Sequence, residues 1–256
     1  MQTRLEAPAQ EPRDVPEGGE IHLAGVSRAF ERRGGETVPA LDGVSLDVAP
    51  GEIVVVVGPS GCGKTTLLEL VCGLQAPDAG TVRAAPAVLM PQRDLLLPWL
   101  SAIDNAALAL RVAGERRARA RERAHPLFHD FGLEGFERAR PHELSGGMRQ
   151  RVAFLRTLLS GKPVLCLDEP FGALDALTRR EMQEWLAAAL AREARTVLLV
   201  THDVEEAALL ADRIVVLSPR PGRVVAELAV DLPRPRRATD PALVALRERA
   251  LEALRS

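Results

Sequence analysis

The segment Gly58–Thr65 constrains this chain more than any other part of its sequence. It reads Gly-Pro-Ser-Gly-Cys-Gly-Lys-Thr and fits the pattern G-x-x-x-x-G-K-[ST]. In such a loop several backbone N–H groups converge on a polyphosphate, and glycines permit the curvature that this requires. Lys64 is placed to reach the β- and γ-phosphates, and the Thr65 hydroxyl is placed to bind Mg²⁺. The pattern therefore predicts a site for a nucleoside triphosphate and Mg²⁺.

The residues on either side of this loop support the prediction. Residues 53–57 are an unbroken β-branched run, which is typical of a parallel strand buried on both faces. Residues 66–72 have a helical pattern that ends at Gly73, with Pro77 beyond it. A strand, a glycine-rich loop and a helix in this order indicate an α/β fold whose helix directs its N-terminal dipole at the anion. The alternative is a glycine-rich turn in any α/β protein.

Composition and charge narrow the class of protein. The 256 residues are 46% apolar and 27% charged, as in ordinary globular proteins. A net charge of −2 gives no reason to expect nucleic acid as a partner. No apolar run approaches the roughly 20 residues that cross a bilayer, and no basic-then-apolar leader opens the sequence. We therefore expect a cytoplasmic location.

Two carboxylates end a second buried strand, at residues 164–169. Asp168 and Glu169 lie at the carboxyl end of this strand, where α/β proteins place their ligands. Asp168 is suited to holding Mg²⁺ through water, and Glu169 could orient or deprotonate an attacking water. His202 follows the buried strand 196–201 and is expected at the same edge of the sheet. The alternatives are a polar strand end and a polar loop residue that both face solvent.

Three other residues are candidates for the site, and two of them have an alternative interpretation. Ser145 is an expected N-cap, and the glycines after it leave backbone N–H groups bare, so this helix suits either an anion or no ligand. Phe30 ends the first predicted strand, where its ring belongs to the core or stacks on an adenine. Cys62 lies at a helix N-terminus beside Lys64, so we expect a lowered pKa for its thiol.

The chain divides into three parts. We expect residues 1–20 to form a disordered tail, residues 21–230 to form the nucleotide-binding domain, and residues 231–256 to form a linker and an amphipathic helix. Within the domain, a helical region is expected at about residues 95–155. Its arginine-rich stretch is typical of a solvated helix face.

From about residue 21 to residue 228 the sequence resembles the ATP-binding subunits of ABC transporters. The resemblance implies a P-loop NTPase (RecA-like) α/β core with an antiparallel β subdomain and an inserted α-helical signature subdomain. It also implies ATP hydrolysis with Mg²⁺. The matching motifs are Gly58–Thr65 (Walker A), Gln92 (Q-loop), Leu144–Met148 (signature), Val164–Glu169 (Walker B), Ala173–Asp175 (D-loop) and His202 (H-loop).

The resemblance also implies roles for single residues. Glu169, His202, Gln92 and Lys64 correspond to the catalytic groups, and Thr65, Gln92 and Asp168 to the Mg²⁺ ligands. Ser145 and Gly147 correspond to residues that contact the γ-phosphate bound to the other protomer of a head-to-tail dimer. The residues that correspond to nucleotide contacts are Phe30, Gly58, Pro59, Ser60, Gly61, Cys62, Gly63, Lys64, Thr65, Thr66, Ser145, Gly146, Gly147 and Asp175.

Within this family, residues 95–105 and 218–223 resemble importers of nitrate, sulfonates, taurine and thiamine-precursor pyrimidines. Pro91 departs from the phenylalanine that usually precedes the Q-loop glutamine there. The resemblance implies a position on the cytoplasmic face of the membrane, with permease subunits and a periplasmic or lipid-anchored solute-binding protein as partners. We expect the permease to contact Leu95–Trp99, an apolar stretch that could otherwise pack between subdomains.

Three other functions compete with import. A soluble ABC ATPase acting on DNA would carry a long coiled coil between Lys64 and Ser145, and none is present. A regulatory module without turnover would not need both Glu169 and His202. Export stays open, because other chains bind the solute.

Overall fold

The computed structural model describes residues 19–31, 35–172, 174–192 and 195–255. Nearly all of the tail expected at residues 1–20 therefore lies outside the described residues. The described strands are β1 (Ile21–Glu31), β2 (Thr37–Val48), β3 (Ile53–Val57), β4 (Ala79–Ala84), β5 (Ala87–Met90), β6 (Val164–Asp168), β7 (Thr196–Thr201), β8 (Arg213–Leu217) and β9 (Val224–Ala229). The helices are α1 (Lys64–Val71), α2 (Ala102–Ala106), α3 (Leu108–Val112), α4 (Arg117–Asp130), the 3₁₀ helix η1 (Pro141–Glu143), α5 (Gly146–Leu158), α6 (Ala176–Arg192), α7 (Val204–Leu210) and α8 (Pro241–Arg255).

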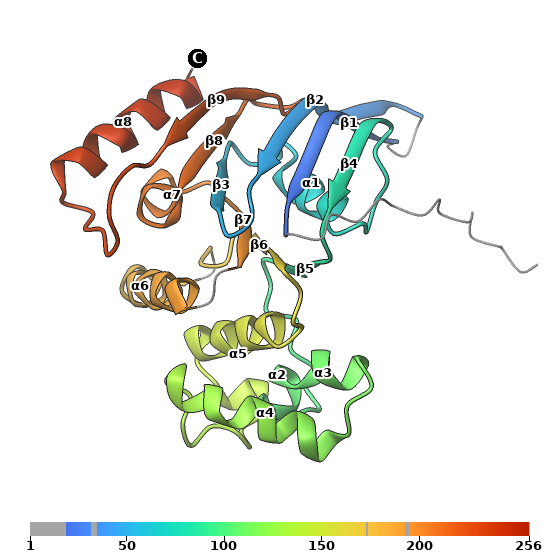
Figure 1. Ribbon diagram of the computed structural model, residues 1–256, viewed down its shortest axis with the longest axis vertical. Helices are drawn as coiled ribbons and strands as arrows, with labels where there is room; N and C mark the ends of the chain where they lie inside the picture. The colour runs from blue at the N-terminus through green and yellow to red at the C-terminus, as the bar shows by residue number, and fades with distance from the viewer. Residues whose placement is uncertain (1–18, 32–34, 173, 193–194, 256) are drawn as a thin grey trace, which may run out of the picture.

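Two sheets form the framework. A six-stranded sheet has the order β5-β6-β7-β3-β8-β9, and a three-stranded antiparallel sheet has the order β2-β1-β4. Figure 1 shows α1 on the side of the large sheet that faces the small sheet, and α6, α7 and α8 on its other side. Helices α2 to α5 are grouped at one end of the molecule (Figure 1).

The central strand β3 is buried along its whole length, as are β6 and β7. Side chains of a strand alternate between its two faces. Val55 and Val57 therefore pack in the core that includes residues of α5, α6, α7 and α8. Val54 and Val56 pack in the core shared with α1 and the small sheet. An unbroken apolar run places an apolar side chain on both faces of the strand. The pattern therefore predicted a strand that is covered on both faces.

The structure differs from the predicted elements in two places. The helical region expected at about residues 95–155 is divided into α2, α3, α4, η1 and α5. Strand β4 was not predicted, because none of its side chains is buried and an exposed strand has no apolar alternation. Its place is set by antiparallel pairing with β1, which links Ile21 to Ala84 and Leu23 to Val82.

Five neighbouring strands of the large sheet run parallel, and β9 alone pairs antiparallel at its edge. The carboxyl ends of β5, β6, β7, β3 and β8 therefore meet at one edge of the sheet, where open α/β sheets bind ligands. Each of these strand ends leads directly into one segment of the site described below. Among the described helices, none is long and apolar enough to cross a membrane.

Candidate nucleotide site

The loop after β3 is shaped by a glycine that no other residue could replace. Gly63 has a φ of 104°, and a Cβ on it would lie 2.6 Å from Leu41 Cδ2 and 2.7 Å from the Ala40 carbonyl oxygen. A side chain here would therefore be strained and would also collide with β2. Helix α1 begins at Lys64 with no side-chain cap, so the first N–H groups of the helix are open to an anion.

Lys64 is folded back over this loop. Its side chain is only 5% exposed, and its Nζ donates to the carbonyl oxygens of Gly58 at 2.7 Å and Pro59 at 3.1 Å. The same Nζ lies 3.7 Å from Glu169 Oε1. An ammonium group has three donors and no acceptor, so this placement holds a buried positive charge inside the curve of the loop.

Thr65 joins the loop to the end of β6. Its hydroxyl donates to Asp168 Oδ2 at 2.9 Å. Burial raises the pKa of Asp168, the nearby charge of Glu169 raises it further, and the hydrogen bond from Thr65 acts in the opposite direction. A partly buried carboxylate beside a hydroxyl is a pair of hard oxygen donors, the kind of ligands that Mg²⁺ prefers.

Glu169 is the point at which the other strand ends converge. Gln92, after β5, donates from Nε2 to Glu169 Oε2 at 3.2 Å. His202, after β7, places Nδ1 3.2 Å from the same oxygen. Glu169 itself has a φ of 41°, which is rare for a residue with a side chain and costs of order 1–3 kcal/mol. The fold holds this carboxylate in a strained position between three polar groups from three different segments.

A pocket of about 450 Å³ opens in front of these groups. Nine of the residues predicted for the site line it, from the exposed ring of Phe30 at one end to Glu169 at the other. Three lining residues were not predicted, two of them from β2 and one from the turn after β8. The twelve are Phe30, Val38, Ala40, Ser60, Gly61, Gly63, Lys64, Thr65, Thr66, Gln92, Glu169 and Arg220.

The signature residues do not reach this pocket within the chain. Ser145 caps α5 by accepting a hydrogen bond from Met148 N at 3.2 Å, and Gly146 is exposed. Asp175 accepts from Thr178 N at 3.1 Å, and the hydrogen bonds of Thr178 lower its pKa. Ala173 of the D-loop lies outside the described residues. Predicted contacts of Ser145, Gly146, Gly147 and Asp175 with a nucleotide therefore need a second copy.

Comparison with known proteins assigns the family. A family model described as ABC transporter matches residues 41–172, just over half of the chain. The chain belongs to the ABC transporter family. Taurine import ATP-binding protein TauB of Chromobacterium violaceum is 46% identical over 241 residues, which are 88% of this chain and 92% of the relative. Aliphatic sulfonates import ATP-binding protein SsuB 1 of Rhodococcus jostii is 46% identical over 221 residues, 84% of this chain and 86% of the relative.

A solved structure shows the same architecture. It is a dimeric ATP-binding cassette in a post-hydrolysis state with ADP and Pi, and it superposes with a TM-score of 0.73 at 29% identity. The superposition covers 83% of this chain and 99% of the other. The predicted fold class is thereby confirmed, and this chain is an ATP-binding ABC ATPase.

The expectation for Cys62 of this ABC ATPase was wrong. Its side chain is 1% exposed and packs beneath the loop, where a Cβ on Gly58 would lie 2.7 Å from its sulfur. Burial raises the pKa of the thiol, and this effect outweighs the opposing charge of Lys64. Cys62 does not line the pocket, and nor do Gly58 and Pro59, whose carbonyl oxygens bind Lys64 instead.

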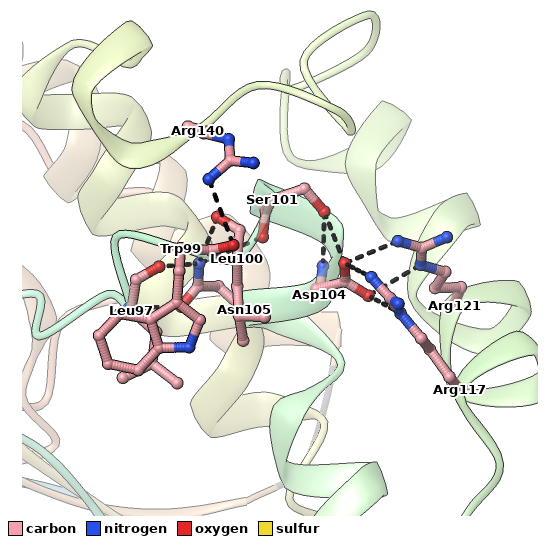
Figure 2. Close-up of polar contacts among 9 residues, drawn as sticks. All are labelled: Leu97, Trp99, Leu100, Ser101, Asp104, Asn105, Arg117, Arg121 and Arg140. Carbon is pink, nitrogen blue, oxygen red and sulfur yellow. Dashed lines mark hydrogen bonds and ion pairs between the residues drawn. The ribbon is translucent and has the colours of Figure 1, made fainter.

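The apolar stretch after Gln92 is divided between core and surface. Leu96 is 8% exposed and packs in the core, whereas Trp99 is 65% exposed. Asn105 is fully buried and fixes the loop: its Oδ1 accepts from Leu97 N at 2.7 Å, and its Nδ2 donates to the Leu97 and Leu100 carbonyl oxygens. Figure 2 shows how this clamp presents the Trp99 indole on the surface.

A second cavity, of about 690 Å³, lies beside Trp99. Arg117 and Arg121 reach across it and both bind Asp104, whose side chain is almost fully buried (Figure 2). Burial acts to raise the pKa of Asp104, but the hydrogen bonds from the two arginines outweigh it and hold the pKa well below its usual range. Two members of the arginine-rich stretch are thus tied to α2. The rest of the lining combines Trp99 and Ile103 with polar and charged side chains.

Proposed function

We propose that this ABC ATPase powers the import of a small organic sulfonate by hydrolysing ATP between two copies of itself. The observation that carries the proposal is the placement of Glu169 among Lys64, Gln92 and His202 at one end of the pocket. Import and the solute class rest on the curated relatives, which are named as taurine and aliphatic sulfonate import proteins. Exporters are not among these named relatives, so export is the less favoured alternative.

The chemistry of the proposed site is phosphoryl transfer to water. Lys64 and the N–H groups at the start of α1 bind the β- and γ-phosphates, and Phe30 stacks on the adenine. Thr65, Asp168 and Gln92 would hold Mg²⁺, which when bound would supply positive charge beside the phosphate oxygens. Glu169 orients the water and takes its proton as the new O–P bond forms and the bond to the β-phosphate oxygen breaks. His202 and Gln92 keep the carboxylate in place.

The dimer completes each site. Ser145 and Gly146 are exposed at the start of α5 and do not line their own pocket. We propose that they, with Gly147, contact the γ-phosphate bound to the other copy, while Asp175 lies at the same interface. The dimeric structure of the related cassette supports this arrangement. A site built from two copies hydrolyses ATP only when the copies close, which couples turnover to a motion.

The test of the catalytic assignment is Glu169→Gln. It should leave MgATP binding intact and lower turnover about a thousandfold, which is about 4 kcal/mol in the barrier. The variant should also accumulate as an ATP-bound dimer in size-exclusion chromatography, because the closed dimer cannot hydrolyse its ATP and reopen. Glu184→Gln is the matched control, since this exposed glutamate pairs only with Arg180 on α6. Hydrolysis near the wild-type rate in Glu169→Gln would remove this residue from the mechanism.

We also propose that the groove beside Trp99 receives a segment of the membrane permease. Trp99 and Leu95 are exposed on a loop that Asn105 holds rigid, and an exposed aromatic side chain over a groove is a typical interface anchor. The same loop begins at Gln92, which contacts Glu169, so docking there has a direct path to the catalytic carboxylate. The chain then lies peripherally on the cytoplasmic face, in a complex with the permease and a periplasmic or lipid-anchored solute-binding protein.

Trp99→Ala tests the docking surface. Because Trp99 is 65% exposed, the variant should keep its melting temperature and basal ATPase activity, unlike a core Trp→Ala change, which costs about 3–5 kcal/mol. Co-purification with the permease and uptake of labelled taurine or an alkanesulfonate should be lost. Val112→Ala, at another exposed apolar residue, is the control and should retain both. Permease binding that survives in Trp99→Ala would contradict the proposal.

A further inference from the structure

The turn after β8 lies at the same edge of the sheet as the catalytic residues. Strand β8 is parallel to β3 and directly beside it, so residues that follow Leu217 emerge next to the phosphate loop that follows Val57. The same topological rule that gathers Gln92, Glu169 and His202 applies to this turn. It contributes Arg220, which lines the nucleotide pocket and has no role in the function proposed above.

The turn, residues 218–223, is wedged between β2 and the phosphate loop. Gly222 donates its N–H to the Ala40 carbonyl oxygen at 2.9 Å and accepts from Asp42 N at 3.0 Å. A Cβ on Gly222 would lie 2.2 Å from the Cys62 carbonyl oxygen, so only glycine allows this approach. Within the turn, the Ser218 hydroxyl accepts from Arg223 N at 3.0 Å and donates to the Pro221 carbonyl oxygen at 2.9 Å. The base of the Arg220 side chain is therefore fixed before any ligand binds.

Arg220 uses only one of its donors on the protein. Its Nε donates to the Gly61 carbonyl oxygen at 2.9 Å. Within the described part of the chain, its two Nη nitrogens have no hydrogen-bond partner, and the side chain is exposed to the pocket. A guanidinium has five N–H donors in a planar fork that matches phosphate oxygens. One end of this fork is anchored on the loop that binds phosphate, and the other end is free.

We propose that Arg220 is a nucleotide-binding residue that donates from its Nη groups to the phosphates that are not transferred. This inference rests on the nucleotide site proposed above. Arg220 is joined to Gly61, three residues before Lys64, and among the described residues no hydrogen bond or ion pair links it to Glu169 or Gln92. It therefore contacts the bound nucleotide and not the attacking water. A contact that is equal in the ground state and the transition state changes KM and leaves kcat almost unaltered.

Three variants separate this role from a structural one. Arg220→Gln removes the charge, Arg220→Lys keeps the charge but changes the anchor on Gly61, and Arg223→Gln is the matched control. Arg223 belongs to the same turn but pairs with Asp42 outside the pocket. The measurements are dissociation constants for MgATP and MgADP, using fluorescent analogues of each nucleotide, together with kcat and KM for ATP hydrolysis.

We expect Arg220→Gln to weaken both MgATP and MgADP about tenfold, the size of one charge-assisted phosphate contact, with kcat within about twofold of wild type. Arg220→Lys should recover most of the affinity, and Arg223→Gln should match wild type. Unchanged affinities in Arg220→Gln would overturn the proposal. A fall in kcat that Arg220→Lys does not rescue would also overturn it, because that pattern marks a purely structural anchor. Failure of the wild-type chain to bind MgATP would instead overturn the proposed function.

Discussion

Helices α1 and α5 both begin with glycine-rich sequence suited to an anion, and the structure builds their N-termini in opposite ways. The start of α1 has no side-chain cap and lies in a pocket lined by the cationic side chains of Lys64 and Arg220. Strand β2 and the turn after β8 pack against it. The start of α5 is capped by Ser145 and lies on the surface, where a Cβ on Gly146 would meet nothing closer than 3.7 Å. One is a site for a ligand. The other is a surface that we infer becomes part of a site only against another copy.

The surface half is nevertheless tied to the catalytic half. Arg149 on α5 binds the Asp94 carboxylate at 3.1 Å, and Arg156 donates to the carbonyl oxygens of Asp94 and Leu95. Burial lowers the pKa of Arg156. Leu95 has a φ of 44°, so this short segment is held in a strained form. Because this segment follows shortly after Gln92, we expect a shift of α5 to reach the group that contacts Glu169.

Among the changes that compare the two N-termini, the largest expected effect tests whether they serve one site from different copies. Lys64→Ala removes the buried cation of the pocket, and Gly146→Asp places a negative charge where the other copy's γ-phosphate is expected. Each variant alone should lose at least about a hundredfold in ATPase activity. When the two variants are mixed and pair at random, about half of the dimers contain one copy of each and have one intact site out of two. The mixture should therefore recover up to about a quarter of wild-type activity.

The stability of Gly146→Asp serves as the control for this experiment. An acidic residue in the first turn of a helix stabilises it by about 0.3–1 kcal/mol, and a Cβ at Gly146 would meet nothing closer than 3.7 Å. The variant should thus unfold at slightly higher denaturant concentration while losing activity. A mixture that remains as inactive as its two components would show that each site is complete within one chain.

A matched pair of glycine substitutions measures how differently the two N-termini are packed. Gly222→Ala forces a methyl group against the Cys62 backbone and should destabilise the chain by about 1–3 kcal/mol, with weaker MgATP binding. Gly146→Ala puts the same methyl group on a helix at ordinary contact distance from Leu174, and it should stabilise by about 0.5–1 kcal/mol. Urea unfolding of both variants gives the comparison. Equal effects of the two substitutions would mean that the turn after β8 does not brace the loop.

The sequence alone could predict those site residues that belong to a motif within one short segment. The runs that form β3, β6 and β7 predicted buried parallel strands, and the residues that end them were found at one edge of the sheet. Arg220 was missed because it reaches the pocket only if β8 lies next to β3. The order of strands in a sheet cannot be read from the sequence of one segment. Cys62 was misjudged because a helix N-terminus is visible in the sequence and the burial of a side chain beneath its own loop is not.

The smallest expected effect concerns Glu206 on α7, which is buried beside Thr201 at the end of β7. Its side chain is 3% exposed; Thr201 at the end of β7 donates to its Oε2 at 3.0 Å, and its Oε1 has no partner in the described part of the chain.

Burial raises the pKa of Glu206 from its ordinary 4.5 to about 8. The charges of Asp203 and Glu169 add to this, while Thr201 and Arg179 of α6 oppose it. The folded chain therefore holds a proton that the unfolded chain releases. The contribution of this group to stability is complete below pH 4.5 and declines as the pH rises through 8. In Glu206→Gln the neutral amide keeps the shape without the titration, so urea unfolding at pH 5, 7 and 9 should show a smaller decline than in wild type. Glu205→Gln, at the neighbouring half-buried residue that pairs with Arg247, should keep the wild-type decline. The same decline in Glu206→Gln as in wild type would place the titrating group elsewhere and leave Glu206 as a packing residue between β7 and α6.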